Sequence, residues 1–233
     1  MRSTRPLSLD DQVTISMASM PERSAGMLTV VKQLIDACDN FELCLNGYPA
    51  DFDDPILHDP KVCVYRTQPV VGARGKFLTS YKLAGYHLTV DDDIDYPDNY
   101  VAALVAAVAV YERRAVVGYH GCLYGSPDAR FLVTFEEAWP RDMPVHSLGT
   151  GLMAYHSSTF SADWYDMQPG LVDYQIAVRA QEQKTPMMLL AHPAGWIKDR
   201  PELSLSTNCL RRNIDEKQKA WQVIRNYPWR LWA

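Results

Sequence analysis

No stretch of this 233-residue sequence approaches the roughly 20 consecutive apolar residues of a transmembrane helix. The first six residues are partly basic, but no apolar segment follows them, so we expect no signal peptide. Acidic residues (28) outnumber basic residues (23), which argues against a general nucleic-acid-binding protein, because such proteins present a basic face. Internal repeats and low-complexity segments are also absent, and the 47% hydrophobic content predicts a globular protein.

Cysteine is scarce, and none of the five cysteines has a C-x-x-C partner of the kind found in zinc sites and redox motifs. The spacing also differs from the disulfide framework of small secreted domains. We therefore expect buried thiols in a reducing compartment, and a cytoplasmic protein. The five residues are Cys38, Cys44, Cys63, Cys122 and Cys209.

The order of the first predicted elements indicates an α/β fold. A strand at Gln12–Ala18 is followed by a helix that Ser24 can cap and that runs to about Asp39. Strands at Phe41–Leu45 and Lys61–Tyr65 come next, as at the start of a nucleotide-binding α/β unit. A chain of 233 residues can bury a good core as a single domain, which is what we expect here.

The second half continues the alternation of helices and strands. A helix from Asp98 to about Arg114 is apolar around nearly its whole circumference and should be deeply buried. The other predicted elements are strands at Ala115–Tyr119, Phe131–Phe135, Pro144–Leu148 and Pro186–Ala191, and helices at Asp173–Gln183 and about Ile214–Arg225.

Three consecutive carboxylates follow a buried strand at Tyr86–Val90. Asp91, Asp92 and Asp93 repel one another, and keeping them ionised side by side is costly unless a cation is present. Hard oxygen ligands suit Mg²⁺ or Mn²⁺. Ligand crevices of α/β proteins lie at the carboxyl ends of strands, which makes this segment the first candidate for a binding site. The alternative is an acidic turn that caps the helix after Pro97.

Basic residues next to glycine form a second candidate. Gly72 and a second glycine flank Arg74, and Lys76 follows; glycines let a backbone approach a phosphate closely. The spacing is not that of a Walker motif. The alternative is a flexible turn before a helix at Lys76–Leu83. Arg23, after the first strand, could meet a phosphate or stack on a base, or could be a solvated arginine at a helix start.

The triple aspartate after a hydrophobic strand resembles the Asp-x-Asp motif of glycosyltransferases with the GT-A fold, in particular the inverting family-two type that builds bacterial polysaccharides. The resemblance implies an α/β, GT-A-like fold with a Rossmann-type nucleotide-binding half and a mixed central sheet flanked by helices. It divides the single domain into a donor half at about 10–100, an acceptor half at about 101–200, and a lid and tail helix at about 201–233.

The resemblance also implies roles for particular residues. Asp91 and Asp93, completed by His192, would hold Mn²⁺ or Mg²⁺ against the diphosphate of a nucleotide-sugar, with a UDP-sugar as the expected donor. Asp173 would be the general base that deprotonates the acceptor hydroxyl, with Asp163 and Asp166 in reserve. The implied donor contacts are Ala18, Ser19, Met20, Arg23, Gly72, Arg74, Lys76, Asp91, Asp92, Gly149, Thr150 and Gly151.

Alternatives stay open for several of these residues. Asp173 could be a helix cap, because the helix dipole favours a carboxylate in the first turn, and it would have another task in a retaining enzyme. The Gly149–Gly151 turn could be a plain hairpin or bulge. The chain as a whole could be a nucleotidyltransferase, or a domain that binds nucleotides or carbohydrates without catalysis.

The acceptor side is less defined. A glycan or glycolipid is the expected acceptor, with loops at 126–141 as a candidate recognition region, since specificity often resides in loops on a rigid scaffold. A polar segment at 201–208 could close over the donor. The aromatic and basic tail at 221–232 suits a membrane interface or contact between copies, or could pack back on the domain.

Overall fold

The computed structural model describes residues 8–68, 70–125, 130–168, 170–200, 222, 224–225 and 227–232. The segment 201–208 and most of the helix expected at 214–225 lie outside these residues, so the predictions for them are not tested. None of the helices among the described residues combines the length and apolar character needed to cross a membrane.

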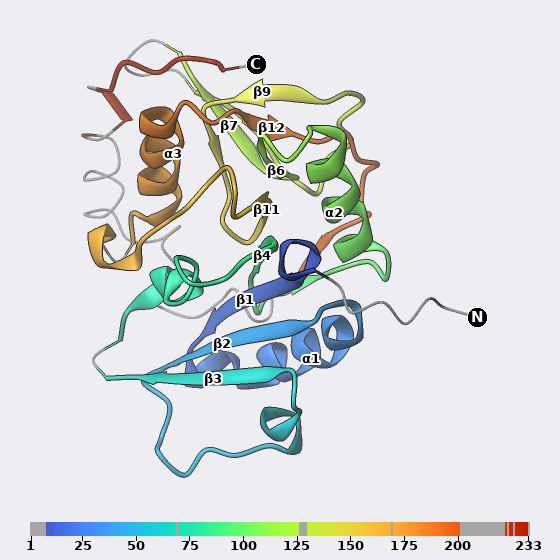
Figure 1. Cartoon of the computed structure of the whole chain (residues 1–233), viewed down its shortest axis with the longest axis vertical. Helices are drawn as coiled ribbons and strands as arrows, with labels where there is room; N and C mark the ends of the chain where they lie inside the picture. The colour runs from blue at the N-terminus through green and yellow to red at the C-terminus, as the bar shows by residue number, and fades with distance from the viewer. Residues whose placement is uncertain are drawn as a thin grey trace.

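An eight-stranded mixed sheet forms the centre of the molecule (Figure 1). Four strands on one side are parallel to their neighbours, and β11 runs antiparallel to both β4 and β6. Beyond β6, β12 is parallel to it and β9 antiparallel to β12. In spatial order the strands are β3 (Val62–Thr67), β2 (Asn40–Asn46), β1 (Val13–Ser19), β4 (Tyr86–Val90), β11 (Leu152–His156), β6 (Val116–Gly118), β12 (Met187–Leu189) and β9 (Met143–Val145).

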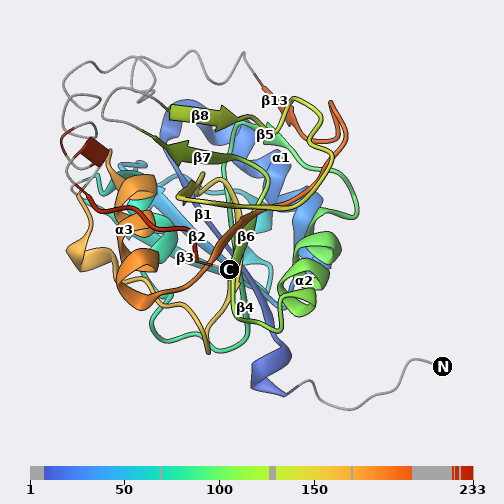
Figure 2. The ribbon, with the colours of Figure 1, turned by 90° about the horizontal axis from the view of Figure 1, so that it is seen from above.

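In the described part of the chain, α1 (Ser24–Leu34) and α2 (Tyr100–Val110) cover one face of the sheet and α3 (Val172–Gln183) covers the other (Figure 2). Alternate residues of β11 show the division: Leu152 and Ala154 pack in the core with α1 and α2, whereas Met153 and Tyr155 pack in the core with α3. Side chains of successive strand residues point to opposite faces, so a strand covered on both sides is buried throughout. The fully buried β4 and β11 fit this rule.

Smaller elements complete the fold. A three-stranded sheet has the order β10 (Ser147–Leu148), β7 (Gly121–Tyr124), β8 (Arg130–Val133), and β13 (Lys198–Asp199) pairs with β5 (Ile94–Asp95). The short 3₁₀ helices are η1 (Leu9–Asp11), η2 (Pro21–Arg23), η3 (Ile35–Ala37), η4 (Pro55–His58), η5 (Gly72–Phe77) and η6 (Trp164–Asp166).

The predicted fold class, an α/β protein with a mixed central sheet flanked by helices, is confirmed, and several details differ from expectation. The glycine and basic segment itself forms the 3₁₀ helix η5, in place of the helix expected at Lys76–Leu83. Helix α1 begins at Ser24 rather than being capped by its side chain. The strand expected at Pro144–Leu148 is divided between two sheets at His146, whose Nδ1 accepts a hydrogen bond from the backbone N–H of Tyr124 (2.8 Å).

Candidate active site

The candidate site lies where the strand order changes direction. From β1 the chain proceeds outward to β2 and β3, then returns to place β4 on the other side of β1. Loops that leave two such neighbouring parallel strands run in opposite directions, which opens a crevice at their carboxyl ends. Because Met17 pairs with Val90, the end of β1 (Ser19) and the residue after it (Met20) lie beside the residues after β4 (Asp91 to Asp93).

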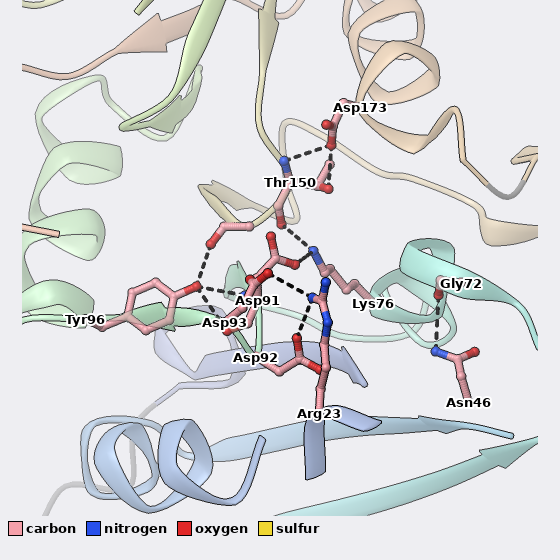
Figure 3. Close-up of polar contacts among 11 residues, drawn as sticks. Arg23, Asn46, Gly72, Lys76, Asp91, Asp92, Asp93, Tyr96, Thr150 and Asp173 are labelled. Atoms are coloured by element: carbon pink, nitrogen blue, oxygen red, sulfur yellow. Dashed lines mark hydrogen bonds and ion pairs between the residues drawn. The ribbon is translucent and has the colours of Figure 1, made fainter. Parts of the chain in front are cut away.

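Arg23 holds two of the three aspartates. Its Nη1 donates to Asp92 Oδ1 (3.0 Å) and to Asp93 Oδ2 (2.9 Å), as Figure 3 shows. The Arg23 side chain is only 14% exposed and that of Asp92 only 3%, so this is a largely buried cluster and not a solvated arginine at a helix start. The guanidinium therefore fixes the loop after β4 against the loop after β1.

The pKa values of two carboxyl groups in this cluster are raised. Burial first, and then the negative charge of Asp91, raises the pKa of Asp93 to about 6, while the charge of Arg23 acts in the opposite direction. Burial likewise raises the pKa of Asp92, whose Oδ2 is buried without a hydrogen-bond partner among the described residues. The cluster has more negative charge than its internal cations balance, as expected of a site that receives a further cation.

The raised pKa of Asp93 predicts a pH-dependent stability. Its folded-state pKa of about 6 exceeds the ordinary 3.8, so the folded protein binds more protons than the unfolded chain between these values. The stabilisation is complete below about pH 4 and is lost as the pH rises through 6. Urea unfolding of the metal-free protein at several pH values should show this loss in the wild type and a smaller loss in Asp93→Asn. Parallel pH profiles of the two proteins would contradict the prediction.

Lys76 lies behind Asp91. Its Nζ forms an ion pair with the Asp91 carboxylate and donates to the backbone carbonyl of Thr150 (3.2 Å). The Lys76 side chain is 2% exposed, whereas that of Asp91 is 36% exposed. Lys76 was expected to contact the donor. In the structure it connects Asp91 to the Gly149–Gly151 turn.

Tyr96 makes a second connection between the same two segments. Its hydroxyl accepts a hydrogen bond from the Asp91 backbone N–H (2.7 Å) and donates one to the Gly151 carbonyl (2.8 Å). The Gly149–Gly151 turn connects β10 to β11, strands of different sheets, and is therefore not a simple hairpin. No sequence pattern pointed to Tyr96, because its role depends on a contact with a residue 55 positions away.

A side chain at position 151 would overlap the Asp91 carboxylate, since a Cβ built on Gly151 falls on Asp91 Oδ2. Gly151→Ala should therefore displace Asp91 and cost on the order of 1–3 kcal/mol in unfolding free energy, as overpacking does. Gly149→Ala is the matched control, because its Cβ would meet only the edge of the His120 ring at 3.0 Å. Urea unfolding of both variants checks this, and equal stability of the two would contradict it.

Asp173 is the second residue of α3 and is exposed. Its Oδ1 accepts two hydrogen bonds from Thr150, one from the backbone N–H (3.0 Å) and one from the hydroxyl (2.6 Å) (Figure 3). A continuous chain of polar contacts thus runs from Asp91 through Lys76 and Thr150 to Asp173. These contacts tie α3 to the turn, a role different from that of a local helix cap.

His192 is not brought to the aspartates. Its Nδ1 contacts the Leu190 carbonyl (2.8 Å), its Nε2 contacts the Thr134 carbonyl (3.4 Å), and its backbone bridges to Trp139. The reason is topological, because His192 follows β12, which lies three strands away from β4. Among the residues that the structure describes, no group of three or more His, Cys, Asp or Glu side chains is arranged to hold a metal.

The remaining predicted donor residues make contacts outside the aspartate cluster. Arg74 donates to the Met167 carbonyl (2.8 Å) and lies over the Trp164 ring, 5.3 Å from its centroid, which joins η5 to the loop that contains η6. The Gly72 carbonyl accepts from Asn46 Nδ2 (3.4 Å). The Ser19 hydroxyl bonds to the hydroxyl of Tyr48 (2.9 Å), a residue that the sequence analysis did not single out.

Further observations concern Ala18, Met20 and the two reserve carboxylates, of which Asp166 is an exposed residue of η6. Ala18 packs beside Gly75 of η5, and the Met20 carbonyl accepts a hydrogen bond from the Tyr48 hydroxyl (2.8 Å). Asp163 accepts from the N–H of Tyr165 (3.1 Å), which is the pattern of a cap on η6. The contacts of Asp163 are thus local, unlike those of Asp173.

The oxygen donors at this site fit a hard divalent cation. Asp91 is partly exposed, and the charge of Asp91 already raises the pKa of Asp93, so a cation between them would relieve their repulsion. Two carboxylates match the usual binding of Mg²⁺, which takes one or two protein carboxylates and completes its shell with water and substrate phosphates. Such a site does not need His192.

No family model matches the sequence, but the chain is similar to a curated protein and to solved structures. The chain is 25% identical over 207 residues to a chicken (Gallus gallus) α-1,6-mannosyl-glycoprotein 4-β-N-acetylglucosaminyltransferase. The match covers 84% of this chain and 43% of the relative, so the chain spans less than half of that protein's length.

A solved structure described as a nucleotide-diphospho-sugar transferase from Desulfovibrio desulfuricans G20 is 12% identical, with 93% of this chain and 98% of that chain covered at a TM-score of 0.46. That score is too low to establish a common fold. The sequence is therefore similar to part of a glycosyltransferase, at an identity that does not by itself establish membership of the family.

Proposed function

We propose that this protein is a glycosyltransferase, which moves a sugar from a nucleotide-sugar, a UDP-sugar in the first instance, to a hydroxyl of a glycan or glycolipid acceptor. The observation that carries the proposal is the polar chain Asp91–Lys76–Thr150–Asp173. It connects a carboxylate cluster at the β1–β4 crevice to an exposed carboxylate at the start of α3. Such an arrangement would give a diphosphate a place at the carboxylate cluster and would give the acceptor hydroxyl a base.

On the donor side, the segment after β1 and the loop after β4 would receive the nucleotide. Arg23 and Lys76 keep the aspartates in place rather than meeting the phosphates themselves. Asp91 and Asp93 would hold Mn²⁺ or Mg²⁺, and the ion, when bound, would neutralise the charge on the leaving nucleoside diphosphate. We also propose that the fold is GT-A-like.

On the acceptor side, Asp173 would take the proton of the attacking hydroxyl. The oxygen that accepts from Thr150 is occupied, which leaves Oδ2 for the proton. A general base must lie within hydrogen-bonding reach of the proton that it removes. The activated acceptor oxygen would attack the anomeric carbon opposite the leaving diphosphate. The new glycosidic bond forms as the bond to the diphosphate breaks, and the configuration inverts.

The name of the chicken relative suggests the sugar. That protein is a 4-β-N-acetylglucosaminyltransferase of mannosyl glycoproteins, so we propose UDP-N-acetylglucosamine as the first donor to test and mannose-terminated oligosaccharides as the first acceptors.

The test is an assay of UDP release and of product mass with Mn²⁺, a panel of UDP-sugars and these acceptors. Transfer of a sugar residue to an acceptor supports the proposal. Binding of UDP without transfer from any donor would favour a non-catalytic binding domain. Release of pyrophosphate from a nucleoside triphosphate and a sugar phosphate would favour a nucleotidyltransferase.

A further inference from the structure

Thr150 places both of its hydrogen-bond donors on one carboxylate oxygen. Its backbone N–H lies 3.0 Å from Asp173 Oδ1 and its Oγ1 lies 2.6 Å from the same atom. Thr150 is buried, with 3% of its surface exposed, whereas Asp173 is exposed. A buried residue therefore determines the orientation of an exposed carboxylate.

The turn that carries Thr150 is itself fixed on three sides. The Thr150 carbonyl accepts from Lys76, the Gly149 N–H donates to the His120 carbonyl (2.9 Å), and the Gly151 carbonyl accepts from Tyr96. A donor held in this way can orient its partner without a large loss of entropy when the site is used.

Helix α3 provides little orientation of its own. The residue before the helix is Leu171, whose side chain cannot cap the helix with a hydrogen bond. Asp173 is the second residue of the helix and lies in its first turn. The helix dipole favours a carboxylate at that position but does not choose among its rotamers. The direction of the carboxylate therefore depends on Thr150.

We propose that Thr150 is the positioning residue of the catalytic base, an inference that rests on the proposed glycosyltransferase activity. Its hydroxyl and N–H hold Asp173 Oδ1, which leaves Oδ2 directed at the acceptor hydroxyl. No proton moves to or from Thr150. Since a misplacement of about 1 Å can cost roughly 10²-fold in rate, loss of the hydroxyl should lower turnover by about 10- to 100-fold.

The experiment compares Thr150→Val with Thr150→Ser in the UDP-N-acetylglucosamine transfer assay. Thr150→Val keeps the shape and the backbone donor but loses the hydroxyl, so kcat should fall by about 10- to 100-fold with the donor KM within about twofold of the wild type. Thr150→Ser restores the hydroxyl and should recover most of the kcat. Calorimetric titration of UDP should give the same affinity in all three proteins.

Asp173→Asn provides the second arm. In that background the addition of Thr150→Val should change the residual kcat by less than about twofold, because the two residues act as a unit. Wild-type kcat in Thr150→Val, or an equal fall in Thr150→Ser, would overturn the positioning role while leaving the proposed function intact. Absence of transfer by the wild type would overturn both. If Thr150→Val does not fold, Thr150→Ala serves in its place.

Discussion

Asp173→Asn is expected to lower kcat by roughly 10²–10⁴-fold, the usual contribution of a positioned general base. An amide cannot accept the proton of the acceptor hydroxyl, but it keeps the size of the carboxylate and can still accept from Thr150 through its oxygen. Donor affinity should therefore change little. The measurement is kcat and the donor KM in the transfer assay, together with UDP affinity by calorimetry.

Asp163→Asn is the matched control. It makes the same chemical change in another carboxylate of the loop before α3, where Asp163 only caps η6. Its kcat should remain within a few-fold of the wild type. If Asp163→Asn lost activity and Asp173→Asn kept it, the base would have to be reassigned.

Of the substitutions discussed, Arg23→Met should lower the unfolding free energy the most. Arg23 is the cation between Asp92 and Asp93, and removing one partner of a buried ion pair leaves uncompensated charge, at a cost of about 3–5 kcal/mol. The loss should be greatest at pH 8 and smaller at pH 5, because protonation of the two carboxyls, whose pKa values are already raised by burial, relieves the repulsion. Urea unfolding at both pH values measures this.

Arg113→Met is the control for that experiment. It breaks an arginine–aspartate contact of similar length, Arg113 to Asp11 (2.8 Å), but this pair is well exposed. Exposed pairs contribute little, so the unfolding free energy of Arg113→Met should stay close to the wild-type value at both pH values. Equal losses in the two variants would mean that the cluster around Arg23 is not the stabilising feature inferred from its burial.

The parts of the fold that follow local rules could be predicted from the sequence. The strand before the triple aspartate has five buried residues, and its apolar run is visible in the sequence. The helices at 100–110 and 172–183 were predicted to within a few residues. The expectation that the first of them is deeply buried is wrong, because one of its sides is exposed, with Val110 at 76%. The alternative for the glycine and basic segment was a turn before a helix at Lys76–Leu83, but the segment itself forms η5, in which Gly75 packs closely on Ala18 and Cys44.

The contacts that organise the site could not be predicted in the same way. Lys76 and Arg23 were expected to meet the donor because basic residues near glycine or a strand end often bind phosphate. The structure pairs them with Asp91, Asp92 and Asp93 because β1, η5 and β4 converge at one sheet edge. His192 was expected near these aspartates because it also follows a strand. Strand order, which one sequence does not reveal, separates them.

The C-terminal tail illustrates the same limit. Its described residues pack back on the domain: Trp229 contacts the rings of Tyr124 and His146, and Arg230 exchanges two backbone hydrogen bonds with the Gln181 side chain. This is the packed alternative for the tail. A membrane or oligomer contact through the tail remains only a prediction.

The central claim is that the β1–β4 crevice binds a nucleoside diphosphate through a metal on its aspartates. The most direct test is calorimetric titration of UDP with and without Mn²⁺. The wild type should bind UDP only with Mn²⁺, Asp93→Ala should lose this binding, and Asp95→Ala should retain it, because Asp95 pairs with Arg200 rather than Arg23. UDP binding that does not need Mn²⁺, or that survives in Asp93→Ala, would contradict the account.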